Sequence, residues 1–128
     1  MKGYITPIEK ETVANTDYRR VLYTAKNCQL VLMSLKAGEE IGEEVHTLDQ
    51  FIRFEEGTAT VYLDGEKHVI EHDHAVIVPA GVRHNVVNES DVDLKLYTLY
   101  APPEHKDGIV QKTKADEQEE HFDGATTE

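Results

Sequence analysis

Glu44 and His46 form the first pair of residues in the sequence that could do chemistry. In an extended chain, residues two positions apart point to the same face, so this carboxylate and this imidazole project side by side. Gln50 opens the next apolar run and has the parity of its buried-type residues, which predicts that its amide points inward. His84 follows a Pro-Gly turn at the start of a later run, where its side chain could meet the other three.

Together these four residues offer two imidazoles, one carboxylate and one amide oxygen, which predicts a site for one divalent metal ion. Two histidines and a carboxylate with an open position suit a catalytic zinc, and the same set is the facial arrangement of non-heme Fe(II) oxygenases. Manganese and nickel also fit these donors, so the sequence leaves the choice among zinc, iron, manganese and nickel open. Gln50 is a weak donor, and the alternative is that it holds a water or a substrate.

Each of these residues also has an ordinary structural interpretation. His46 and His84 could be hydrogen-bonded interior histidines, and Glu44 could be a solvated carboxylate among its acidic neighbours. Two further residues are candidates for catalysis. Tyr100 shares its face with apolar residues and could line the cavity or simply pack in the core, and His105 follows two prolines and could fold over the cavity as an acid or base.

Two other features resemble sites but favour a surface position. His72 and His74 repeat the spacing of two, yet they lie in a turn beside other polar residues, so a second metal site is the weaker interpretation. Arg83 precedes His84 and could reach an anionic substrate, although an ordinary surface arginine is expected.

The elements that must position these residues are short strands divided by turn residues, which predicts an all-β fold, an antiparallel barrel or sandwich. The Asp64-Gly65 pair between two β-prone runs is a strong hairpin signal. No helix is expected before the C-terminal tail. The expected strands are 18–25, 29–36, 50–56, 58–63, 66–70, 75–78, 84–87 and 94–100.

Apolar content falls near the C-terminus, which divides the chain into a barrel, residues 1–113, and an acidic tail, residues 114–128. A short helix over 115–121 and a frayed or disordered end over 123–128 are expected in this tail.

The segments 38–57 and 73–88 resemble the paired motifs of the cupin superfamily, G(X)5HXH(X)3,4E(X)6G and G(X)5PXG(X)2H(X)3N. The matching positions are Gly38, His46, Gly57, Pro79, Gly81, His84 and Asn88. Three positions depart from the motifs: Glu44 replaces a histidine, Gln50 replaces a glutamate, and His72 replaces a glycine. The resemblance implies a jelly-roll barrel with a metal on Glu44, His46, Gln50 and His84.

The chain looks most like the small single-domain cupins described as mannose-6-phosphate-isomerase-like. This implies a metal-dependent enzyme acting on a small polar molecule such as a sugar or sugar phosphate. Two alternatives remain open: a non-heme Fe(II) dioxygenase, and a non-catalytic cupin that binds a small molecule. A fold alone does not fix a reaction.

The amino-acid composition and net charge limit the classes of molecule that the chain is expected to bind. The formal net charge is -12, from 25 acidic and 13 basic residues, which disfavours nucleic acid and anionic membranes. The start of the chain lacks the apolar stretch of a secretion signal and no run reaches membrane-spanning length, so a cytoplasmic protein is expected. Cys28, the single cysteine, is expected to be buried. Phe51 has the outward parity of its strand, and together with the habit of cupins to pair this predicts a homodimer.

Overall fold

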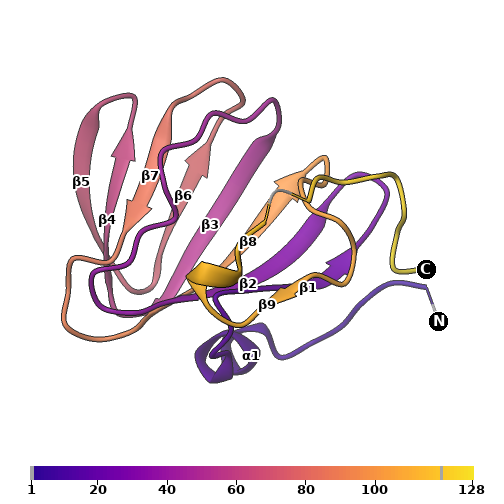
Figure 1. Ribbon diagram of the computed structural model, residues 1–128, viewed down its shortest axis with the longest axis horizontal. Helices are drawn as coiled ribbons and strands as arrows, with labels where there is room; N and C mark the ends of the chain where they lie inside the picture. The colour runs from indigo at the N-terminus through magenta and orange to yellow at the C-terminus, as the bar shows by residue number, and fades with distance from the viewer. Residues whose placement is uncertain (1, 119) are drawn as a thin grey trace.

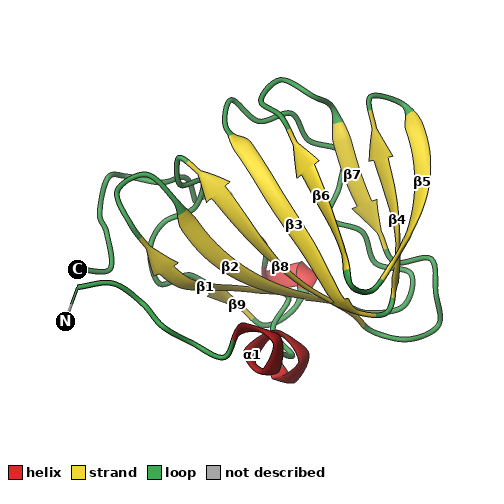
Figure 2. Ribbon diagram, turned by 180° about the vertical axis from the view of Figure 1, so that it is seen from behind, coloured by secondary structure: helices red, strands yellow, loops and turns green. Residues whose placement is uncertain are grey.

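The computed structural model describes residues 2–118 and 120–128, and it is built from two antiparallel sheets packed face to face (Figures 1 and 2). The six-stranded sheet has the order β6-β3-β8-β2-β1-β9, and the three-stranded sheet has the order β5-β4-β7. The strands are β1 (Arg19–Thr24), β2 (Gln29–Leu35), β3 (Asp49–Glu56), β4 (Thr58–Leu63), β5 (Glu66–Glu71), β6 (His74–Val78), β7 (His84–Val87), β8 (Leu94–Ala101) and β9 (Val110–Gln111). The all-β, antiparallel prediction is confirmed.

Alternation along each strand places one row of side chains in the space between the sheets. On β3, Gln50, Ile52 and Phe54 are buried, while Phe51 on the opposite face is half-buried. This confirms the inward parity predicted for Gln50. The two central residues of the hairpin between β4 and β5, Asp64 and Gly65, both have positive φ, 51° and 85°. Those angles fit the type I′ turn that the Asp-Gly pair predicts.

The long connection between β2 and β3, residues 36–48, runs antiparallel to β7 and extends the smaller sheet (Figure 1). Its backbone bonds to β7 begin at Gly38, whose N–H donates to the carbonyl of Asn88 at 2.8 Å. They continue at Ile41, whose N–H donates to the carbonyl of Val86 at 2.9 Å. Because of this pairing, the two motif segments lie side by side although they are far apart in sequence.

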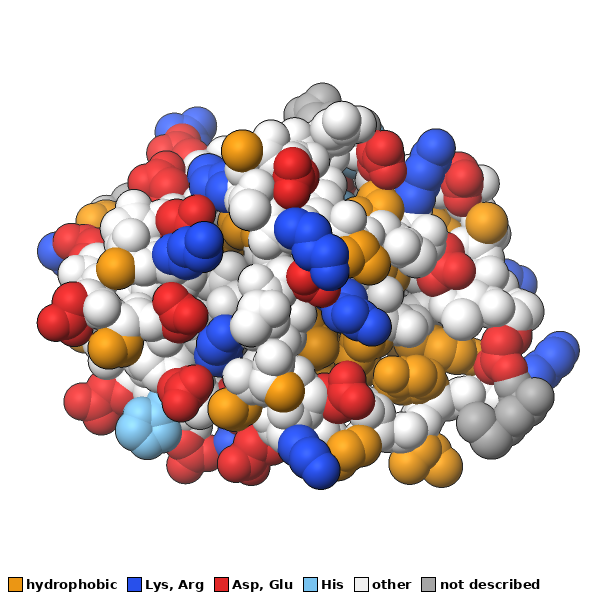
Figure 3. Space-filling view, turned by 60° about the horizontal axis from the view of Figure 1, so that its bottom comes forward, with side chains coloured by type: hydrophobic (Ala, Val, Ile, Leu, Met, Phe, Trp, Pro, Cys, Tyr) orange, Lys and Arg blue, Asp and Glu red, His pale blue; other side chains and the backbone are white. Residues whose placement is uncertain are grey.

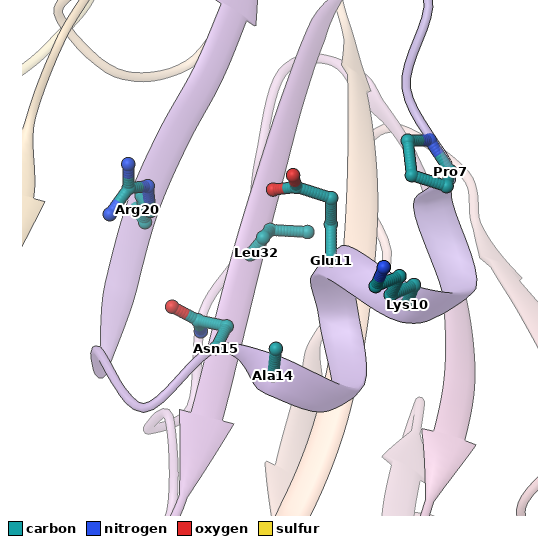
Figure 4. A pocket seen from close by; sticks show the side chains of 7 residues that line it. All are labelled: Pro7, Lys10, Glu11, Ala14, Asn15, Arg20 and Leu32. Carbon is teal, nitrogen blue, oxygen red and sulfur yellow. The ribbon is translucent and has the colours of Figure 1, made fainter.

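A helix, α1 (Ile8–Ala14), packs on the outer face of the six-stranded sheet, so the prediction of no helix before the tail is wrong. Pro7 precedes the helix and Glu9 and Glu11 occupy its first turn, which are ordinary helix-start signals. The helix packs on β8 and β3. Figure 4 shows Glu11 and Lys10 of α1 beside Leu32 of β2, and these residues line a surface hollow next to the helix. Buried Lys95 of β8 donates to the carbonyl of Asn15 at the end of the helix, at 2.6 Å, and so ties it to the sheet.

The C-terminal segment folds against the barrel. In place of the helix expected over 115–121, a short 3-10 helix, η1 (Lys114–Asp116), is present. The end of the segment is bound to β1, because the N–H of Thr127 donates to the carbonyl of Thr24 at 2.9 Å and the hydroxyl of Thr127 accepts from the N–H of Thr24 at 2.8 Å. The structure therefore differs from the frayed end that the composition predicts. The boundary at residue 113 stays a prediction.

Two smaller points concern exposure. Cys28 is exposed in the turn before β2, which corrects the expectation that it is buried. Among the described residues, no helix has the length and apolar character needed to cross a bilayer.

Candidate metal site

Glu44, His46 and His84 converge between the two sheets. One donor atom from each, a carboxylate oxygen or an imidazole nitrogen, lies within 4.8 Å of the other two. His46 and His84 are buried and Glu44 is partly exposed, with Glu44 Oε2 3.6 Å from His46 Nε2. Three donors this close can bind one ion, since metal–nitrogen and metal–oxygen bonds of about 2.0–2.2 Å bring ligand atoms together at such separations. The structure thus brings together three of the four residues predicted to hold a metal.

Backbone hydrogen bonds fix two of these ligands against each other and the third close by. The N–H of Glu44 donates to the carbonyl of His84, and the N–H of His84 donates to the carbonyl of Glu44, each at 2.9 Å. The N–H of Gly81 donates to the carbonyl of His46 at 2.8 Å. The Pro-Gly turn therefore positions both motif histidines.

Each imidazole has one nitrogen oriented by a neighbouring group and one turned toward the site. His84 Nδ1 lies 2.9 Å from the carbonyl oxygen of Val82, which only accepts, so Nδ1 carries the proton and Nε2 keeps its lone pair for a metal. His46 Nδ1 lies 3.7 Å from the carboxylate of Glu104, on the far side of the ring from Glu44. A carboxylate beside the second nitrogen is a common support of metal-binding histidines. The sequence analysis missed Glu104.

Gln50, the fourth predicted ligand, is 4% exposed at the start of β3. Its amide nitrogen donates to the hydroxyl of Thr98 at 3.1 Å, and its carbonyl oxygen Oε1 is buried and meets no hydrogen-bond donor within the described part of the chain. A buried acceptor without a partner needs an explanation, and a metal or a metal-bound water would supply one. Its assignment as a ligand remains a proposal.

Tyr100 and His105 lie beside the histidine pair. The ring centroid of Tyr100 is 5.9 Å from that of His46 and 5.2 Å from that of His105, in edge-to-face geometry. Burial raises the pKa of the Tyr100 hydroxyl, so this group stays protonated at neutral pH. Burial, reinforced by the charge of Arg19, lowers the pKa of His105 to about 3, which keeps its imidazole neutral. Their catalytic roles remain predictions.

Glu44 lines a cavity of about 290 Å³, together with Glu104 and His105. Its walls include Arg19 of β1 and the C-terminal segment through Glu117, Gln118, Glu120 and His121. The sequence analysis missed Arg19 and Glu117. In the sequence Arg19 is one of two adjacent arginines, and nothing there distinguishes it from Arg20 as the buried one. Glu117 lies in an acidic segment whose composition does not indicate contact with the interior.

Burial shifts the pKa values of two of the candidate ligands. Burial raises the pKa of Glu44, and the positive charge of Arg19 opposes this effect. Burial also lowers the pKa of His46, although Glu104 opposes it. At neutral pH His46 is therefore unprotonated and able to bind a metal.

The remaining candidates lie on the surface. Arg83 pairs with Glu43 at 3.2 Å, and both side chains are exposed, which fits the ordinary interpretation of that arginine. His72 and His74 are exposed, and within the part of the chain that the structure describes they join no group of metal-binding side chains.

Comparisons with known proteins agree with this geometry. Residues 31–100 match the family model described as the cupin domain. The chain is 43% identical over 123 residues to the uncharacterized protein YrkC of Bacillus subtilis, covering 90% of this chain and 66% of that protein. It is 45% identical over 113 residues to an uncharacterized protein of Acanthamoeba polyphaga mimivirus, covering 84% of this chain and 70% of the other. The chain thus spans about two thirds of the length of these relatives.

A solved structure of related sequence has the same fold as this chain. The crystal structure of a Bacillus halodurans protein superimposes with a TM-score of 0.88 at 42% identity, covering 90% of this chain and 92% of the other. The family match covers more than half of the sequence and includes all four predicted ligands and the whole of strands β3 to β7. The chain belongs to the cupin family.

Proposed function

We propose that this cupin binds one divalent metal ion and is a metal-dependent enzyme that acts on a small polar molecule, such as a sugar or sugar phosphate. The observation that carries the proposal is the convergence of Glu44, His46 and His84, of which Glu44 lines a cavity. The unpartnered oxygen of Gln50 supports a fourth contact to the ion or to its water. A divalent ion held there would act as a Lewis acid on an oxygen atom of the substrate.

The chain's own residues would then handle protons and orientation. Neutral His105 has its Nε2 atom buried without a hydrogen-bond partner among the described residues, so it can accept a hydrogen bond from a substrate hydroxyl. Protonated Tyr100 can donate a hydrogen bond but not serve as a base. The carboxylate of Glu104, 3.7 Å from His46 Nδ1, would help to orient that ring.

A non-heme Fe(II) dioxygenase is the second candidate, because two histidines and one carboxylate form the ligand set of that class. Anaerobic reconstitution with iron, followed by oxygen uptake with candidate substrates, separates the two. Turnover with zinc in the absence of oxygen would exclude the oxygenase. Ligand binding that survives Glu44→Ala, with no reaction under either condition, would favour a non-catalytic binding cupin.

We also propose that the chain forms a homodimer. A row of apolar side chains crosses the outer face of the six-stranded sheet, since Phe51 pairs with Ile77 on one side and Leu99 on the other, and Leu99 pairs with Leu30. Ile77 is 65% exposed, and the other three are half-buried. Figure 3, which views the side where α1 lies, shows hydrophobic side chains gathered between charged ones. A second copy would cover such a face.

A further inference from the structure

We propose that Arg19 and Glu117 form a subsite that binds an uncharged oxygen atom of the substrate and disfavours anions, with Glu117 as the specificity-determining residue. The inference rests on the proposed function and deepens it. Between the two substrate classes left open, it selects uncharged hydroxyl or carbonyl compounds over phosphate esters.

Arg19 is a buried cation with an unused donor. Its side chain is 4% exposed, yet it contributes to the wall of the cavity that holds Glu44. One terminal nitrogen, Nη1, donates to Gln111 at 2.8 Å and to Glu117 at 3.0 Å. The Nε–H group is buried and meets no acceptor among the described residues. A guanidinium donor left unpaired in a buried site is costly, so a ligand oxygen is the natural partner.

A second unpaired group lies in the same cavity. His105 contributes to the same wall, and its Nε2 atom is also buried, with no hydrogen-bond partner in the residues that the structure describes. The ring is neutral, so Nε2 can accept from a hydroxyl group or donate to a carbonyl group, according to the tautomer. A molecule with several oxygen atoms would satisfy both Arg19 and His105.

The charge of Arg19 is already balanced. Glu117 Oε2 accepts from Arg19 and from the hydroxyl of Tyr18, at 3.0 and 3.1 Å, and Lys114 lies 3.6 Å from Glu117 Oε1. Although burial alone would raise it, the pKa of Glu117 is lowered because Arg19 stabilises the carboxylate. Arg19 therefore offers a ligand a donor but little net attraction for negative charge.

The rest of the cavity wall opposes anions. Besides Glu117 it includes the carboxylates of Glu43, Glu44, Glu104 and Glu120, against Arg19 as its one lysine or arginine among the described residues. A phosphate ester would carry up to two negative charges into this field, whereas a polyol or a hydroxy carbonyl compound would not. The unpaired donors and the charge of the cavity wall thus both favour an uncharged ligand that carries several oxygen atoms.

The test compares D-glyceramide with D-glycerate, which have the same size and the same two hydroxyl groups but differ by one charge. Affinities are measured by calorimetry on protein with and without zinc, for the wild type and for Glu117→Gln, which keeps an acceptor for Arg19 and removes the charge. Glu43→Gln is the matched control, because it removes an equal charge from the same wall at an exposed position. The quantity compared between variants is the ratio of the glycerate affinity to the glyceramide affinity. Because the intrinsic affinity of a carboxylate for zinc is the same in every variant, it cancels in this comparison.

We expect Glu117→Gln to shift the ratio of affinities about ten-fold toward glycerate, and Glu43→Gln to shift it less than about two-fold, because exposed charges are screened. Arg19→Lys keeps the charge and removes the Nε donor, so it should weaken glyceramide binding about five-fold or more. Thermal unfolding verifies that each variant is folded, and Glu117→Gln decides alone if Arg19→Lys does not fold.

Equal shifts of the affinity ratio in Glu117→Gln and Glu43→Gln would overturn the subsite. A folded Arg19→Lys variant with unchanged affinity for glyceramide would do the same. So would a wild type that does not bind glyceramide. Zinc content, measured on the same samples, separates the two proposals. Protein that holds zinc but shows no charge preference contradicts the subsite alone, whereas protein that binds no divalent metal after reconstitution contradicts the metal-dependent function. The titration without zinc still tests the subsite in that case.

Discussion

Glu44 and His84 donate their backbone N–H groups to each other's carbonyl oxygens, at 2.9 Å in both directions. This isolated antiparallel bridge joins the segment between β2 and β3 to the start of β7, so two ligands separated by 40 positions in sequence hold a fixed relation even without a metal. The side chains of the site thus depend on backbone pairing, and their chemistry can be altered by substitution without dismantling the fold.

Glu104 should support the metal through His46. Its carboxylate lies 3.7 Å from His46 Nδ1 and 3.2 Å from His121 Nδ1. Glu104→Gln should lower zinc affinity about ten-fold, because the carboxylate orients the ring and raises its basicity. Competition with a chelator measures this effect. Glu120→Gln is the control, since that residue lines the same cavity and contributes its backbone carbonyl to Lys106; an equal loss in both variants would contradict the role of Glu104.

His105 should make the metal-free protein less stable in acid. Its pKa is about 3 in the folded chain and about 6.5 in the unfolded chain, so the unfolded state binds more protons between these values. The stability associated with neutral His105 is complete above pH 6.5 and is lost as the pH falls toward 3. Between pH 6.5 and 4.5 the wild type should lose about 2 to 3 kcal/mol more than His105→Gln. Urea unfolding at both pH values provides the comparison, and equal losses would show that His105 is not the group responsible.

Gly57 should tolerate no side chain. A Cβ atom there would lie 2.8 Å from the carbonyl oxygen of Asp93 and 3.2 Å from Leu94 Cα, at a φ of +91°. Gly57→Ala should lower the free energy of unfolding by about 3 kcal/mol, from both the backbone angle and the clash. Gly38, also in the motif, has a φ of +82° with open space around it, so Gly38→Ala should cost about 1 kcal/mol. If chemical denaturation showed the same loss of unfolding free energy for Gly57→Ala and Gly38→Ala, close packing at Gly57 would be unimportant.

The outer face of the six-stranded sheet should hold the dimer together. Ile77→Glu combined with Phe51→Glu should give a monomer at tens of micromolar, roughly the range where specific dimers persist, because charges would be buried without partners. Sedimentation measures the mass. Val69→Glu, at a position 66% exposed on β5 of the other sheet, should leave the mass unchanged. A monomeric wild type at the same concentration would remove the proposal.

The strands and the three residues that could hold a metal were predictable because local patterns determine them. Alternation placed Gln50 inside, and the Asp64-Gly65 turn defined its hairpin. Helix α1 was missed because a short amphipathic segment has little periodicity, although Pro7 and its acidic first turn were signals. Arg19 and Glu117 could not be found, because they lie 98 positions apart and their contact depends on how the C-terminal segment packs on the barrel. Composition alone indicates solvation for that segment.

Metal content, measured on protein purified without chelator, tests the central claim most directly. Elemental analysis should find about one divalent ion per chain in the wild type, with strong loss in His84→Ala and Glu44→Ala, because each removes one of three converging donors. Glu43→Ala, one residue from Glu44 and paired with Arg83, should keep the ion. A folded wild type that binds no divalent metal after reconstitution, or a His84→Ala variant that binds it equally well, would contradict the account.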